Sequence, residues 1–233
     1  MEHPILWLTD FFKYLGLIPD PHHPPIWLAS HVTYTWLIMT FLVLVAYLAM
    51  RKATITPKPV QNLIEIVILG FGNLIKDTMG EKGMVFMPLL IAEALFIFTS
   101  NVVGVIPGFL SPTANLNTNV AMALVVFSTT HVVGVKTHGF KYIKQFLGPV
   151  WWLTPLILPI EIISHLSRPL SLSVRLFGNI HGEDLVLLIL LFLVPYLVPL
   201  PIMFLMILTS ALQTFVFVLL TMLYLSGAME EAH

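Results

Sequence analysis

Five apolar stretches, each long enough to cross a lipid bilayer, constrain the fold of this chain more than any other feature. A membrane-spanning helix needs about 20 predominantly apolar residues, and within hydrocarbon only helices and closed barrels satisfy every backbone hydrogen bond. Only 10% of the 233 residues are charged, against about 25% in soluble domains. The sequence therefore predicts an all-α polytopic membrane protein. The five stretches are residues 29–50, 84–106, 118–135, 149–194 and 202–225.

The segments outside these stretches complete a single membrane domain over residues 1–233. Residues 60–80 alternate apolar and polar side chains at helical period, and their glycines and charges favour an interfacial amphipathic helix over a span. Residues 1–28 are expected to form an outside-facing segment with a proline-rich loop. His22 and His23 lie in that loop without further ligands nearby, which indicates a solvated pair rather than a metal site.

The basic residues predict the orientation of the chain. Lysine and arginine concentrate on the cytoplasmic side of membrane proteins. In a model with five crossings, eight basic residues fall on one side, whereas only Lys13 falls on the other. The N-terminus is then outside and the C-terminus cytoplasmic. The eight residues are Arg51, Lys52, Lys58, Lys76, Lys82, Lys136, Lys141 and Lys144.

The stretch 149–194 is too long to stand upright in a bilayer. A continuous helix of these residues would be about 69 Å long, more than twice the hydrocarbon thickness of about 30 Å. Either Pro155, Pro159 and Pro169 break the helix, or it lies steeply tilted, or both hold. With 202–225 it forms a long tilted hairpin, as 84–106 and 118–135 form a shorter one.

A polar stripe runs along this long stretch and carries Arg175. An arginine at the centre of a membrane helix costs about 2.5 to 3.5 kcal/mol on insertion scales, so its presence points to a function. At about 100° per residue, seven residues fall within roughly 80° of one another: Glu161, Ser164, Arg168, Ser171, Arg175, Asn179 and Gly182. Asp184 lies nearly opposite Arg175, and Glu183 lies to its side, so neither is a simple helical partner. A partner for Arg175 must come from another element or another chain.

Translocation is the function class that this stripe favours. The sequence has no zinc-protease motif, no nucleophile elbow, no glycine-rich phosphate loop and no cysteine. Its serines near His165 and His181 are of the kind that hydrogen-bond helix backbones. Asp, Glu and His within membrane helices are the usual material of proton relays. We expect no cofactor and no metal.

Residues 167–179, SRPLSLSVRLFGN, resemble the signature of the a subunit of F-type ATP synthases of the bacterial type. Further similarity comes from NVVGVIP at 101–107, PTANLN at 112–117 and LQTFVFVLLTMLYL at 212–225. The resemblance covers nearly the whole chain in the expected order and length. It implies the stationary half of a rotary membrane motor, with two offset half-channels that couple proton flow to rotation and ATP synthesis.

The resemblance also implies roles for individual residues. Arg175 matches the family's essential arginine, which faces a ring of c subunits. Glu161 and Ser164 match positions of the cytoplasm-side half-channel. Asn179 and Gln213 match positions near the arginine, and Asp184 matches the acidic position of the entry half-channel.

The sequence departs from the family pattern in several places. Met206 stands where some members have a histidine or an acid, and Asn115 stands where many have aspartate. Glu183 and His181 are added near Asp184, and we expect the three to supply the entry relay together; an interfacial role for the first two is the alternative. Glu93 either faces the polar interior or is structural.

As implied partners, the resemblance adds the c-subunit ring, the b-subunit stator stalk and the rest of the ATP synthase, in the lipid of a bacterial inner membrane. No nucleic acid and no active site of its own are expected. The c-subunit carboxyl and its neighbours set the choice between H⁺ and Na⁺, and we expect H⁺. The main alternative is a self-contained proton-coupled transporter, which would work without a ring. An intramembrane enzyme is the third alternative and a structural scaffold the fourth.

Overall fold

The computed structural model describes residues 14, 29–51, 59–106, 108–139, 142, 153–193 and 199–229. Residues 1–28, Tyr14 excepted, lie outside this part, so the structure does not test the expectations for His22 and His23. Apart from short turns, the described residues are helical, and they contain no strand, which confirms the all-α class. The helices are α2 (Ser30–Met50), α3 (Pro59–Met79), α4 (Met87–Val105), α5 (Leu116–His138), α7 (Thr154–Leu193) and α8 (Pro199–Met229), with short 3₁₀ helices η2 (Glu81–Phe86) and η3 (Pro112–Ala114).

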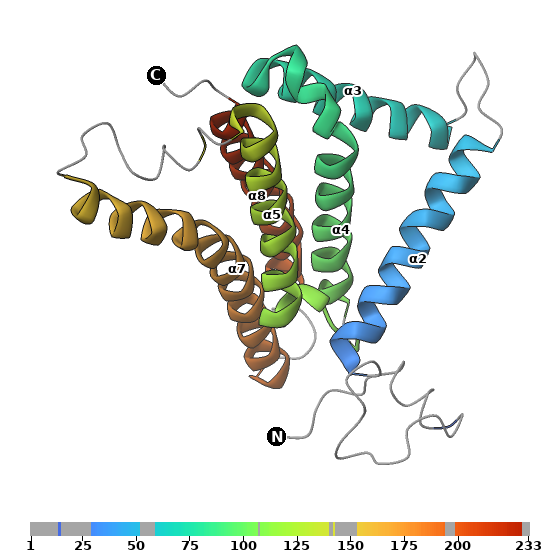
Figure 1. The fold of residues 1–233 in the computed structure, drawn as a ribbon. Coiled ribbons are helices and arrows are strands. Elements are labelled where there is room, and N and C mark those ends of the chain that lie inside the picture. Colours follow the sequence, from blue (N-terminus) through green and yellow to red (C-terminus); the bar gives the residue numbers. More distant parts are fainter. Residues whose placement is uncertain are drawn as a thin grey trace.

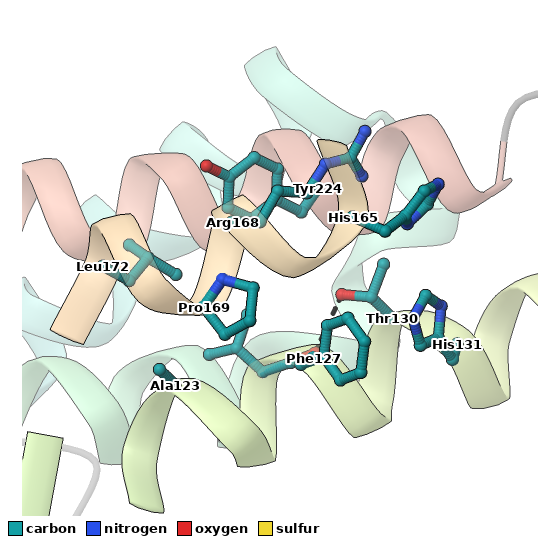
Figure 2. A pocket seen from close by; sticks show the side chains of 10 residues that line it. Ala123, Phe127, Thr130, His131, His165, Arg168, Pro169, Leu172 and Tyr224 are labelled. Atoms are coloured by element: carbon teal, nitrogen blue, oxygen red, sulfur yellow. Dashed lines mark hydrogen bonds between the residues drawn. The ribbon is translucent and has the colours of Figure 1, made fainter. Parts of the chain in front are cut away.

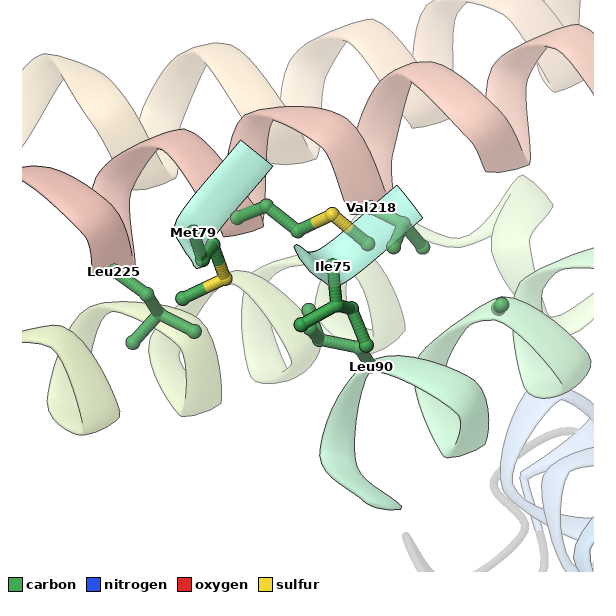
Figure 3. Close-up of a cluster of buried hydrophobic side chains, with 7 residues drawn as sticks. Ile75, Met79, Leu90, Val218 and Leu225 are labelled. Atoms are coloured by element: carbon green, nitrogen blue, oxygen red, sulfur yellow. The ribbon is translucent and has the colours of Figure 1, made fainter. Parts of the chain in front are cut away.

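Five of these helical segments are long and apolar enough to cross a membrane. They include α2, α4, α5, α7 and α8, whereas α3 runs across one end of the bundle (Figure 1). One face of α3 buries Ile75 and Met79 against Leu90 of α4 and Val218 and Leu225 of α8 (Figure 3). An amphipathic helix anchored on the ends of the spans is the arrangement expected of an interfacial segment.

Helices α4, α5 and α8 form the centre of the bundle, and α7 packs against α5 (Figure 1). A buried cluster joins Leu172 and Leu176 of α7 to Ala123 and Val126 of α5 and Phe217 of α8. Helix α2 diverges from α4 toward the α3 end, so the two form a V (Figure 1). The polar stripe of α7 is thus held on a helix whose apolar side is fixed against the core.

Helix α7 is one helix of 40 residues, uninterrupted at Pro159 and Pro169. The prolines therefore do not break it, and of the readings left open by the sequence the continuous helix is the observed one. An internal proline removes one backbone hydrogen bond and crowds the preceding turn, which bends a helix, and α7 is visibly curved (Figure 1). At 1.5 Å per residue it is about 60 Å long, so it crosses a bilayer only at a steep tilt.

Helix α8 begins before the apolar stretch 202–225 predicted from the sequence. Its first residue is Pro199, and Pro201 lies in its first turn. The first backbone N–H groups of a helix have no partner within it, so prolines in the first turn cost no hydrogen bond.

A buried polar network closes the turn between α4 and α5. The hydroxyl of Thr113 donates to the side-chain oxygen of Asn101 at 2.6 Å, and the Asn119 amide donates to the Thr113 carbonyl at 2.7 Å. A Cβ atom on Gly104 would lie 2.6 Å from Cβ of Ser111. Gly104 therefore serves the close approach of this turn, and α4 ends at Val105, one residue before the end of the stretch 84–106 predicted from the sequence.

Candidate functional site

Arg175 lies on the outward face of α7. Its side chain is exposed, and it makes no ion pair among the described residues, whose side-chain pairs are Lys76–Glu81 and Glu161–His165. The local sequence explains the placement, because Leu172 and Leu176 occupy the buried face of the same turns. A charged group on a membrane helix without a partner is costly, so the arrangement requires a counter-charge that these residues of the chain do not supply.

Two glycines leave the surface next to Arg175 open. A Cβ atom added to Gly178 or Gly182 would meet nothing within 4 Å. The small size of these residues therefore serves no contact among the described residues. Small residues on membrane helices let a neighbouring helix approach closely.

Asn179 and Gln213 lie together between α7 and α8. The Asn179 amide donates to the Gln213 side-chain oxygen at 2.7 Å. Gln213 is only 6% exposed, and its own amide nitrogen has no acceptor among the described residues. The pair ties the two long helices together one helical turn beyond Arg175.

Glu161 and Ser164 lie toward the N-terminal end of α7. The Glu161 carboxylate is 3.2 Å from Nε2 of His165, and the carbonyl of Ser164 accepts a hydrogen bond from Ser167 at 2.7 Å. Along the helix, Glu161 is about 21 Å from Arg175. His165 is not among the site residues predicted from the sequence, although its i+4 spacing from Glu161 is a signal that points to it.

The acidic residues at the other end of α7 lie on its packed face. Glu183 and Asp184 are half-buried, one turn from the buried residues Ile180 and Leu187. Glu183 lies beside Thr209 of α8. His181 is exposed and stacks on Phe177, with ring centroids 5.1 Å apart. The structure thus groups Glu183 with Asp184 and places His181 on the outer face.

Met206 and Glu93 both lie apart from Arg175. Met206 is buried against Val105 and Leu187. Glu93 is 7% exposed, and neither carboxyl oxygen has a partner among the described residues. It borders a cavity of about 820 Å³ between α2, α4 and α5, away from α7.

The fold and this polar surface define a class of protein. One of the five candidate membrane spans, α7, carries an exposed arginine between Glu161 and Asp184, and this arginine forms no ion pair among the described residues. This is the layout of an ion-translocating membrane subunit whose arginine meets its counter-charge elsewhere.

The family model described as ATP synthase A chain matches residues 32–226, and the chain belongs to this family. It is 51% identical to the ATP synthase subunit a of Geobacter sulfurreducens over 233 residues, which cover 100% of both chains. It is 56% identical to the ATP synthase subunit a 2 of Syntrophotalea carbinolica over 204 residues, 88% of this chain and 87% of that protein. These similarities confirm the resemblance noted from the sequence.

Proposed function

We propose that this chain is the stator subunit of the rotary membrane motor of a bacterial F-type ATP synthase. It passes protons to and from carboxyl groups on a rotating ring of c subunits, and so couples proton flow to rotation and ATP synthesis. Family membership supports this role, since the relatives are ATP synthase a subunits over their full length.

The observation that carries the proposal is the exposed guanidinium of Arg175, which has no counter-ion among the described residues. A guanidinium stays charged at any working pH. An opposite charge within about 4 to 6 Å favours the ionised form of a carboxyl group. A protonated carboxyl brought past Arg175 therefore releases its proton, and the open surface at Gly178 and Gly182 leaves room for the helix that carries it.

Two acid-bearing regions at different depths supply the two half-channels. Glu161 and Ser164 serve one, and Glu183 and Asp184, with His181 at its outer edge, serve the other. Glu161 and Asp184 are 23 residues apart, about 35 Å along α7, and Arg175 lies between them. A positive charge at that point opposes direct passage of protons from one region to the other, so each proton must travel with the ring. Asn179 and Gln213 hold α7 and α8 together beside the arginine.

The orientation with the N-terminus outside and the C-terminus cytoplasmic has support from the ends of the helices. Helix α3, the C-terminal end of α5 and the C-terminal end of α8 lie at one end of the bundle, opposite the beginning of α2 (Figure 1). Lys76 and Lys82 belong to the segment at that end, and Lys136 to the last turn of α5. Basic residues mark the cytoplasmic side. The b-subunit stalk is the further partner in this assignment.

Reconstitution separates this function from that of a self-contained transporter. The purified chain in lipid vesicles is expected to carry no proton flux, whereas vesicles with the whole complex pump protons when ATP is added. Proton flux by the chain alone would favour the transporter.

A further inference from the structure

Four side chains that can carry a proton form a line between α5 and α7. They lie near the end of the bundle that carries Lys76, Lys82 and Lys136, which we call the basic end. The Tyr142 hydroxyl lies 2.7 Å from Nδ1 of His131. The rings of His131 and His165 have centroids 5.3 Å apart, and Nε2 of His165 lies 3.2 Å from Glu161. The line starts at Tyr142, just beyond α5, and ends at Glu161, which the proposed function places in one of the two half-channels.

A small cavity lies beside the two imidazole rings. Figure 2 shows both rings at one end of a cavity between α5 and α7. The cavity is also bordered by Thr130 and Arg168. Its volume of about 10 Å³ is close to the space that one water molecule needs. Proton transfer requires groups within hydrogen-bond reach or bridged by one water. With ring centroids 5.3 Å apart, transfer between the two imidazoles requires either a rotation that brings their nitrogens within hydrogen-bond reach or one bridging water.

Arg168 does not pair with Glu161, so the Glu161 carboxylate remains available to His165. Its guanidinium lies 5.1 Å from the centroid of the Tyr224 ring on α8. Among the described residues Arg168 forms no ion pair, and Glu161 pairs with His165 instead. Arg168 and Glu161 on α7, Tyr142 beyond α5 and Tyr224 on α8 are the charged or titratable groups of the described residues around the two rings.

Imidazole chemistry fits a relay at this place. A neutral imidazole donates through one nitrogen and accepts through the other, and its ordinary pKa of about 6.5 lets it change charge near neutral pH. In each transfer an imidazole releases a proton from the nitrogen that faces the next acceptor and takes one up at the nitrogen that faces the group behind it, which exchanges its tautomer. Reorientation of the two rings and of the Tyr142 hydroxyl restores the starting state before the next passage, and the relay works in either direction.

We propose that Tyr142, His131 and His165 form a proton relay to Glu161, so that the half-channel at the basic end of the bundle opens between α5 and α7. This rests on the proposed function and adds to it a route and three residues.

The test uses the whole ATP synthase in vesicles, with ATP-driven proton pumping measured against pH on the side of the soluble head. We expect His131→Gln and His165→Gln to lower the pumping rate at least about threefold. The loss should grow as pH rises, because scarce protons make delivery limiting. Added imidazole should restore pumping in His165→Ala. His138→Gln, in the last turn of α5, is the matched control and should pump normally.

Pumping by both glutamine variants at the wild-type rate over the whole pH range would overturn the relay. A loss that is independent of pH and insensitive to imidazole would also overturn it, because packing alone explains such a loss. If a histidine variant fails to assemble, Tyr142→Phe removes only a hydroxyl and should show the same pH trend more weakly. An Arg175→Ala complex in the same assay separates the two proposals. Normal pumping by this complex contradicts the proposed function. Loss of pumping by this complex together with normal pumping by the histidine variants contradicts only the relay.

Discussion

The Asn179 amide on α7 hydrogen-bonds the Gln213 side-chain oxygen on α8 over 2.7 Å. The two residues are 34 positions apart in sequence, and they join the long helices one turn from Arg175. A contact between two neutral side chains thus fixes α7 against α8 next to the arginine.

Replacing Asn179 and Gln213 should lower the stability of the protein non-additively, because the two side chains interact. Hydrogen bonds between membrane helices contribute about 0.6 kcal/mol on average in double-mutant cycles. We expect Asn179→Leu and Gln213→Leu to be individually destabilising, and the double variant to be less destabilised than the sum by about that amount. Thermal unfolding of the purified complex measures the cycle, and strictly additive effects would show that the pair does not interact.

Arg175→Lys should fail to replace the arginine. A lysine ammonium is a compact, strongly hydrated charge that shifts its pKa readily when desolvated, whereas a guanidinium is planar and permanently charged. We expect ATP-driven pumping to fall at least about tenfold with the complex still assembled. Arg51→Lys, at the end of α2 and over the ring of Tyr47, is the control. Wild-type pumping by the Arg175 variant would contradict the electrostatic account.

Gly178→Leu should block function without disturbing the fold of this chain. An added Cβ meets nothing within 4 Å at this position, so any clash arises with the approaching ring. We expect the complex to pump poorly or to lose its ring during purification. Gly70→Leu on α3 is the matched control, since it is equally open in the structure. Normal pumping by Gly178→Leu would show that no helix approaches this face.

Glu93→Gln should stabilise the protein if the carboxyl group has no partner in the assembled complex. A buried polar group without a hydrogen-bond partner is costly, and a charged one more so. We expect the midpoint of thermal unfolding to rise by about 2 to 4 °C, the shift that about 1 kcal/mol produces in a chain of this size. A fall in the midpoint would indicate that a donor from another subunit reaches Glu93 in the cavity beside α2.

Apolar stretch lengths are sufficient to predict the spans, because hydrocarbon leaves the backbone few alternatives to a helix. The continuity of α7 is harder to predict from the sequence. Pro159 and Pro169 indicate local breaks, whereas α7 is continuous and packs on α5. Helical periodicity is enough to define the polar stripe around Arg175. It does not pair Asn179 with Gln213 or His131 with His165, because such contacts join helices distant in sequence and depend on how those helices pack.

The most direct test of the account replaces the arginine itself. Vesicles with the whole complex carrying Arg175→Ala should hydrolyse ATP at the soluble head and yet pump no protons, while Arg51→Ala pumps as the wild type does. The account predicts this loss because no other described residue offers an exposed, unpaired guanidinium between the two acid-bearing regions of α7. Coupled pumping at the wild-type rate in the Arg175→Ala complex would contradict it.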